Sequence, residues 1–153
     1  MAVLTVSDTR TETDDRSGAA ISRLLSEAGH TRLDYRILPD EPQQVAEQVQ
    51  GWLQVPELDG VLINGGTGIA PRDTTYEAVA GLLDRRLDGF GELFRMLSYR
   101  EIGGRAMLSR AVAGIASGKI LFSMPGSTPA VTLAMKELIL PQLSHLAGEL
   151  RKP

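Results

Sequence analysis

The sequence predicts a single α/β domain over residues 1–153, with a mostly parallel mixed sheet that contains one antiparallel strand. Three observations predict this fold class. Strand and helix patterns alternate through the first 63 residues, a hairpin pattern follows near residue 117, and the length is the commonest for one domain. A chain of this length buries roughly 70% of its unfolded surface, which is enough to form a core without disulfides.

The first half of the sequence has the order strand, helix, strand, helix, strand. Residues 2–6 and 61–63 are apolar runs typical of buried strands, and residues 33–37 alternate apolar and polar side chains. Apolar residues at helical spacing occupy the segments between them: Ile21, Leu24, Leu25 and Ala28, then Val45, Val49, Trp52 and Leu53. This order implies parallel strands joined by right-handed crossovers.

The second half predicts further helices and a pair of strands. These segments are helices at 78–83 and 90–97, a further turn at 105–109, strands at 111–116 and 119–124, and helices after Pro129 and from Pro141. The two strands flank Ser117-Gly118, a pattern typical of a β-hairpin. One strand should therefore run opposite to the rest of the sheet.

The composition excludes several kinds of site and partner. The chain has no cysteine and two histidines, which excludes disulfides, thiolate metal sites and a histidine metal cluster. A net charge of −3 argues against nucleic-acid binding, and no apolar run approaches the roughly 20 residues of a membrane span. The first residues form a strand-like run instead of a signal peptide, so we expect a cytoplasmic protein.

Polar loops follow four of the predicted strands, at residues 7–11, 39–42, 64–75 and 125–128. In an open parallel sheet, such loops meet at one edge, where ligands bind. The longest loop contains Gly65-Gly66-Thr67-Gly68, whose missing Cβ atoms let backbone N–H groups approach an anion. A plain strand-to-helix turn is the alternative, but long loops in compact domains usually have a function. No lysine follows these glycines directly, which excludes the usual phosphate-loop signature.

Two aspartates, Asp40 and Asp73, are candidate Mg²⁺ ligands. Thr74 and Glu77 fit a capping box, which leaves Asp73 free to bind a metal ion shared with phosphates. Asp40 and Gln43 fit the same cap spacing, so the cap and ligand interpretations of Asp40 both stay open.

The remaining candidates are Ser7, Asp8, Gly126 and Ser127, together with the arginines Arg10, Arg72 and Arg110. Ser7 and Asp8 also fit a solvated turn. Ser127 also fits a helix N-cap that is followed by a proline in the first turn. The arginines could contact phosphates, although single arginines are more often ion-paired surface groups. No G-x-S-x-G motif presents a serine nucleophile, which argues against acyl transfer.

Several segments spread over nearly the whole chain carry a family resemblance. They are Val6-Ser7-Asp8-Thr9-Arg10-Thr11, Leu38-Pro39-Asp40-Glu41, Gly65-Gly66-Thr67-Gly68, Arg72-Asp73-Thr74-Thr75, Gly89-Phe90-Gly91-Glu92, Ala106-Met107-Leu108-Ser109-Arg110 and Met124-Pro125-Gly126-Ser127. In combination, they resemble the MoaB/MogA family of molybdenum cofactor biosynthesis. Residues 73–75 and 94–99 are more similar to MoaB than to MogA.

The resemblance implies a three-layer α/β/α fold with a mixed sheet. It also implies a homo-oligomer, a trimer or a hexamer, with other enzymes of cofactor biosynthesis as candidate partners. The implied reaction is molybdopterin adenylyltransfer, in which molybdopterin and ATP, with Mg²⁺, give adenylated molybdopterin and pyrophosphate. The resemblance implies these site residues: Asp40 and Asp73 for catalysis and Mg²⁺, Gly65, Gly66, Thr67 and Gly68 for the nucleotide, Ser7 and Asp8 at the mouth of the site, and Gly126 and Ser127 on the pterin side.

Two other functions stay open beside the enzyme. One is a non-catalytic oligomer that holds, delivers or senses molybdopterin, and the other is an α/β nucleotide-binding domain of another purpose. The presence of both Asp40 and Asp73 favours the enzyme.

Overall fold

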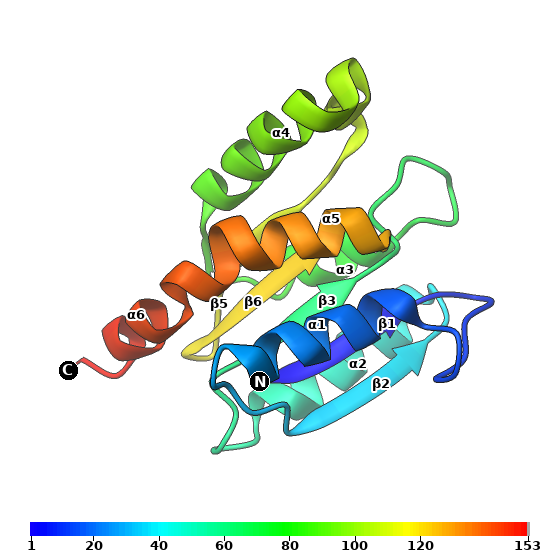
Figure 1. The fold of residues 1–153 in the computed structure, drawn as a ribbon. Coiled ribbons are helices and arrows are strands. Elements are labelled where there is room, and N and C mark those ends of the chain that lie inside the picture. The colour runs from blue at the N-terminus through cyan, green and yellow to red at the C-terminus, as the bar shows by residue number, and fades with distance from the viewer. Residues whose placement is uncertain (153) are drawn as a thin grey trace.

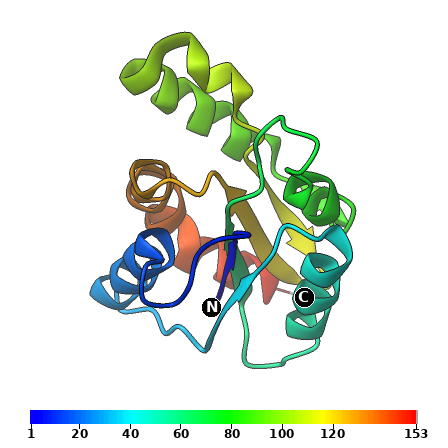
Figure 2. The same cartoon turned by 90° about the vertical axis from the view of Figure 1, so that its right-hand side faces the viewer.

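The computed structural model describes residues 1–152 and contains one six-stranded sheet with helices on both faces (Figures 1 and 2). The strands are β1 (Ala2–Val6), β2 (Asp34–Leu38), β3 (Gly60–Asn64), β4 (Arg85–Arg86), β5 (Val112–Ala116) and β6 (Lys119–Met124), in the spatial order β2-β1-β3-β6-β5-β4. The first four in this order are parallel, β5 runs antiparallel to β6, and β4 runs antiparallel to β5. The three-layer mixed sheet with one reversed strand is confirmed. The two-residue strand β4 was not predicted, because it is too short to show a pattern.

The helical segments are α1 (Arg16–Glu27), α2 (Pro42–Leu53), α3 (Thr75–Ala80), α4 (Asp88–Ile102), the 3₁₀ segment η1 (Gly103–Leu108), α5 (Thr128–Leu133), the π segment η2 (Ala134–Ile139) and α6 (Leu140–Leu150). The last three form one uninterrupted helical run, orange to red in Figure 1, and not two separate helices as predicted. Pro141 lacks an N–H, and it follows a π segment in which the α-helical hydrogen-bond ladder is already interrupted. Within residues 1–152, no helix is long and apolar enough to cross a membrane.

Side chains of the central strands alternate between two cores, one on each face of the sheet. Val3 and Leu62 face the core that α1, α4 and the α5–α6 run cover. Leu4 and Ile63 face the opposite core, covered by α2 and α3. This packing fixes the register of β1 against β3, because a slip of one residue would move every buried side chain to the wrong face.

Two helices differ in extent from the prediction. Helix α3 ends at Ala80, so Leu82 and Leu83 lie beyond it and pack against the core from a turn. Helix α4 is longer than predicted and, with η1, projects from the body of the molecule (Figure 2). Its inner face buries Phe90 and Phe94. Its outer face and η1 expose a group of large apolar side chains: Leu93, Met96, Tyr99, Ile102, Met107 and Leu108.

Candidate functional site

A cavity of about 400 Å³ opens at the carboxyl ends of β1, β3 and β6. The chain leaves β1 toward β2 on one side and returns to β3 on the other, so the gap between β1 and β3 is a topological switch point. The predicted residues that line this cavity are Ser7, Arg10, Gly65, Gly66, Thr67, Gly68, Asp73, Gly126 and Ser127. The structure thus brings three of the four predicted loops together. The fourth, residues 39–42, does not line the cavity.

The glycine loop needs its glycines for two physical reasons. Gly65 and Gly66 have φ values of +99° and +62°, which side chains rarely tolerate. A Cβ at Gly65 would lie 2.1 Å from the Val6 carbonyl oxygen, and a Cβ at Gly66 would lie 2.1 Å from Thr75 Oγ1. Among residues 1–152, no backbone or side-chain acceptor takes the N–H groups of Gly66, Thr67 or Gly68. Three consecutive backbone donors at the cavity are therefore available to a ligand.

Asp40 lies under this loop and holds it in place. Its Oδ1 accepts hydrogen bonds from Thr74 N at 3.1 Å, Thr74 Oγ1 at 2.9 Å and Thr75 Oγ1 at 3.2 Å. The residue is buried, and a Cβ at Gly66 would lie 2.4 Å from its Oδ2. Of the two interpretations left open for Asp40, the cap of α2 is wrong. The N-cap of α2 is Glu41, which makes no side-chain cap hydrogen bond, and Asp40 instead stabilises the start of α3 from the far side of the loop.

The predicted capping box of α3 is also wrong. Thr74 occupies the N-cap position, but its hydroxyl donates to Asp40 and makes no cap hydrogen bond. Glu77 forms an ion pair with Arg110 instead of returning to the helix start. Arg110 in turn donates to the carbonyl oxygens of Thr67 at 3.2 Å and Asp73 at 2.8 Å. The local spacing suggested a cap, but these long-range partners supply stronger, charge-assisted contacts.

Asp73 lies in the long loop and lines the cavity. Its Oδ2 accepts a hydrogen bond from Ala70 N at 3.1 Å, and a Cβ at Gly68 would lie 2.6 Å from the same oxygen. It does not cap α3, in agreement with the prediction. Its carboxylate therefore borders the available backbone donors of the glycine loop.

The two aspartates do not by themselves form a metal cage. Within the described part of the chain, no group of three or more histidine, cysteine, aspartate or glutamate side chains could hold a metal ion. Mg²⁺, however, is commonly held by one or two carboxylates together with substrate phosphates. Asp73 fits that mode directly. Asp40 offers only Oδ2, because the three hydrogen bonds above all fall on Oδ1.

Ser7 and Asp8 adopt the turn that was the alternative to a ligand role. Ser7 Oγ accepts from Thr9 N and Arg10 N, and Ser7 also lines the cavity. Asp8 does not line the cavity; it accepts from Asp40 N at 3.0 Å and forms an ion pair with Arg72. Hydrogen bonds from Arg72 and from Asp40 N hold the pKa of Asp8 below its usual value. Asp8 is thus brought beside Asp40 and not into the cavity.

A buried carboxylate that the sequence analysis did not single out organises the loop after β1. Asp15 accepts hydrogen bonds from Thr5 Oγ1 at 2.5 Å and Tyr35 OH at 2.6 Å, and it caps α1 through Gly18 N at 3.0 Å. Arg10 also donates to it, at 3.2 Å. Burial acts to raise the pKa of Asp15, but these hydrogen bonds outweigh burial and lower it. Its position directly before α1 was the available signal, because aspartate is a preferred N-cap.

Contacts from α1 and α5 surround Gly126 and Ser127, the two residues that the resemblance assigns to the pterin. Ser17 Oγ accepts from Arg10 at 3.0 Å and donates to the Gly126 carbonyl at 2.6 Å. Gly126 packs against Gly65, where a Cβ would lie 3.0 Å from the Gly65 Cα. Ser127 caps α5 through Ala130 N, as its structural alternative predicted. Its side chain has a structural contact even though the residue borders the cavity.

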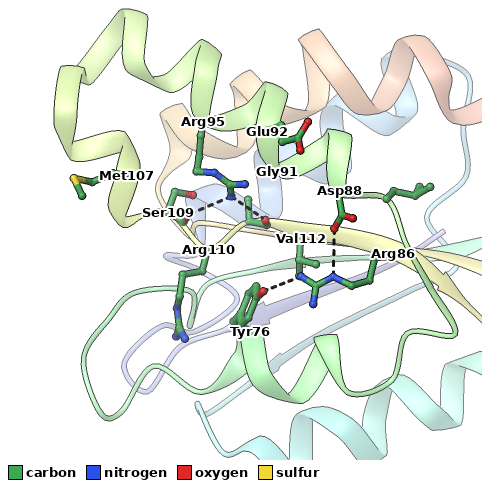
Figure 3. A pocket seen from close by; sticks show the side chains of 12 residues that line it. Tyr76, Arg86, Asp88, Gly91, Glu92, Arg95, Met107, Ser109, Arg110 and Val112 are labelled. Carbon is green, nitrogen blue, oxygen red and sulfur yellow. Dashed lines mark hydrogen bonds and ion pairs between the residues drawn. The ribbon is translucent and has the colours of Figure 1, made fainter.

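Another cavity, of about 420 Å³, lies between α3, α4 and β5 (Figure 3). Arg86 there contacts the Tyr76 hydroxyl at 2.8 Å and Asp88 at 3.5 Å, as the dashed lines in Figure 3 show. Arg95 donates to the carbonyl oxygens of Ser109 and Ala111 at 3.4 and 3.5 Å. The predicted candidate Arg110 lines this cavity, whereas the glycine loop, Asp73, Gly126 and Ser127 do not. The functional assignment therefore concerns the cavity at the switch point.

Comparison with known proteins gives the same picture as the geometry. A family model described as "Probable molybdopterin binding domain" matches residues 2–145. A relative from Halalkalibacterium halodurans, named Molybdenum cofactor biosynthesis protein B, is 53% identical over 155 residues, which cover 98% of this chain and 89% of the relative. A Bacillus subtilis protein of the same name is 50% identical over 151 residues, with the same coverage.

Solved structures of molybdenum and tungsten cofactor biosynthesis proteins have the same fold as this chain. A crystal structure of a Molybdenum cofactor biosynthesis protein B has a TM-score of 0.97 and 51% identity, and covers 99% of this chain and 95% of that one. The tungsten cofactor synthesizing protein MoaB from Pyrococcus furiosus has a TM-score of 0.89 and 37% identity, with 99% and 96% covered. A MogA structure at 24% identity shares the fold, with a TM-score of 0.88. The chain therefore belongs to the MoaB/MogA family of molybdenum cofactor biosynthesis proteins and is closer to MoaB.

Proposed function

We propose that this protein adenylates molybdopterin with Mg-ATP in the cavity at the switch point, and releases pyrophosphate. The observation that carries the proposal is the row of available backbone donors at Gly66, Thr67 and Gly68, next to the carboxylate of Asp73. Backbone donors of this kind bind phosphates without a lysine. Membership of the family supports molybdopterin as the second substrate.

The reaction requires alignment more than acid–base catalysis. A terminal phosphate oxygen of molybdopterin attacks the α-phosphorus of ATP, a new P–O bond forms, and the bond to the β-phosphate oxygen breaks to release pyrophosphate. The nucleophile is already ionised at neutral pH, so no strong general base is needed. The backbone donors of the glycine loop stabilise the charge that spreads over the phosphate oxygens, and they are fixed in place before the reaction.

The two aspartates have different parts in this proposal. Asp73 lines the cavity and would hold Mg²⁺ together with the phosphates, and the ion would neutralise charge on the leaving group. Asp40 holds the loop in its working conformation through Thr74 and Thr75, and its Oδ2 would be the second carboxylate oxygen. We therefore treat Asp73 as the catalytic candidate and Asp40 as a residue with both a structural and a metal-binding part.

Pyrophosphate release on mixing the purified protein with Mg-ATP and molybdopterin tests the proposal. The expected result is one pyrophosphate for each molybdopterin adenylated, with no release when either substrate is omitted. A protein that binds molybdopterin without releasing pyrophosphate would defeat the proposed enzyme. Two observations favour that second candidate, a molybdopterin-binding module: Oδ1 of Asp40 is committed to the loop, and residues 1–152 form no cluster of three metal-binding side chains.

A further inference from the structure

Asn64 carries a buried carbonyl oxygen that has no partner in the described part of the chain. The residue ends β3, is fully buried, and lines the cavity at the switch point. Its Oδ1 accepts no hydrogen bond from residues 1–152. An unpaired buried polar atom destabilises the folded state, so it calls for an explanation.

The orientation of the Asn64 amide follows from its neighbours. Its Nδ2 donates to the Leu4 carbonyl at 3.2 Å and to Thr5 Oγ1 at 2.9 Å. The Leu4 carbonyl can only accept, and Thr5 uses its single proton to donate to the carboxylate of Asp15 at 2.5 Å. Both positions therefore require an N–H from Asn64. A flipped amide would place its oxygen against two acceptors, so Oδ1 must be on the opposite side.

That opposite side lies toward Gly126, which borders the cavity. A Cβ at Gly126 would lie 3.9 Å from Asn64 Oδ1, so the oxygen lies close to the place where Gly126 borders the cavity. Gly126 and Gly65, which pack against each other there, carry no side chain that could donate to Oδ1. Asn64 Oδ1 is thus a fixed acceptor at the edge of the cavity, and residues 1–152 supply no donor for it.

We propose, as a deepening of the proposed function and resting on it, that Asn64 Oδ1 accepts a hydrogen bond from an uncharged donor on the organic part of the bound ligand, such as a ring N–H. A phosphate cannot take this place, because at neutral pH its oxygens are acceptors and would be repelled by a carbonyl oxygen. The ligand is therefore oriented in the cavity. Its ring-bearing end lies at Asn64, and its phosphates lie at the backbone donors of Gly66, Thr67 and Gly68.

Both substrates of the proposed reaction carry uncharged N–H donors on their ring systems: ring N–H groups on the pterin, and the exocyclic amino group on adenine. The test therefore measures the affinity of the wild-type protein and its variants for molybdopterin, Mg-AMP and pyrophosphate separately. Asn64→Ala should weaken binding of one of the two ring-bearing ligands roughly ten- to hundredfold, the effect of a buried ligand donor left unpaired. Its affinity for pyrophosphate should be unchanged. The ligand whose affinity falls identifies the ring that Asn64 contacts.

Two further variants separate ligand contact from fold stability. Asn64→Asp keeps an acceptor toward the cavity, and burial favours the neutral carboxyl, whose O–H can replace a contact of the amide. It should therefore recover most of the lost affinity. Ser123→Ala is the matched control, because Ser123 Oγ on β6 is also buried and unpaired among the described residues but does not line the cavity. It should leave all three affinities unchanged.

Two results would overturn the inference. In the first, Asn64→Ala binds all three ligands as tightly as the wild-type protein does. The partner of Oδ1 would then be an internal water. The second is an equal loss for all three ligands in both Asn64 variants, with a matching fall in melting temperature, because Asn64 would then be only structural. The proposed function fails separately, if the wild-type protein binds molybdopterin but releases no pyrophosphate from Mg-ATP.

Discussion

Asp40 and Thr74, which are 34 residues apart in sequence, are joined by two hydrogen bonds: Oδ1 of Asp40 accepts both the backbone N–H and the hydroxyl of Thr74. This contact attaches the loop after β2 to the start of α3. It also sets the closing end of the long loop that carries Gly66 and Asp73. The shape of the cavity therefore depends on a residue that does not line it.

Asp40→Ala should destabilise the protein by about 2–4 kcal/mol, because three donors on Thr74 and Thr75 lose a buried, charged acceptor. This exceeds the roughly 1 kcal/mol expected for a helix cap. Urea unfolding measures the loss. Asp73→Asn is the control and should change the unfolding free energy by less than about 0.5 kcal/mol, because an amide oxygen can still accept from Ala70 N. Similar losses for the two variants would contradict this assignment.

The glycine loop supports a second prediction about stability. Gly66→Ala should destabilise the protein by at least about 1–2 kcal/mol, because an alanine at φ +62° is strained and its Cβ would also meet Thr75 Oγ1. Gly66→Val is a poor test of ligand binding for the same reason, since the larger side chain would disturb the fold. The control is Gly51→Ala in α2, where an added Cβ meets nothing within 4 Å. It should stabilise the helix by roughly 0.5–1 kcal/mol.

Asp15 predicts a dependence of stability on pH. Its folded pKa is held below the usual 3.8, because hydrogen bonds to its carboxylate outweigh burial. The ionised form therefore stabilises the folded state above about pH 4, and this contribution is lost as the pH falls through the folded pKa. The unfolding free energy of wild type minus that of Asp15→Asn should be constant from pH 5 to 8 and shrink below pH 4. A difference that grows on acidification would have the wrong sign.

The parallel half of the fold was predictable because its signals are local. The apolar runs at Ala2–Val6 and Gly60–Asn64 each mark a buried strand. The helical spacing of apolar residues marks the buried face of α1 and of α2. The convergence of three loops could also be predicted, because the carboxyl ends of parallel strands lie at one edge of the sheet. The hydrogen-bond partners within the site could not be predicted from the sequence. Asp40 and Asn64 bond to residues that are distant in sequence, and local cap spacing cannot show such partners.

The exposed face of α4 and η1 predicts self-association. Leu93, Met96, Tyr99, Ile102, Met107 and Leu108 are all about half exposed or more, which is unusual for so many large apolar side chains on one projecting element. We expect a trimer or a hexamer. Native mass spectrometry should show it, and Met96→Asp should weaken it, whereas Lys136→Glu, exposed on η2, should not. A wild-type protein that is monomeric at micromolar concentration would contradict the prediction.

The last prediction concerns the proposed chemistry at Asp73, which lines the cavity next to the free backbone donors of the glycine loop. Adenylyl transfer spreads negative charge around the α-phosphorus, and a carboxylate can be close to that charge only with a cation between them. Asp73→Asn and chelation of Mg²⁺ should each reduce single-turnover pyrophosphate release by on the order of a hundredfold, which corresponds to a few kcal/mol of transition-state stabilisation. Molybdopterin binding should persist in both cases, and Asp84→Asn, remote from the cavity lining, is the control for a general effect of lost charge. If Asp73→Asn retains wild-type turnover, the metal and the chemistry must rest on other residues; if it loses molybdopterin binding as well, Asp73 binds substrate and the loss of turnover says nothing about the transition state.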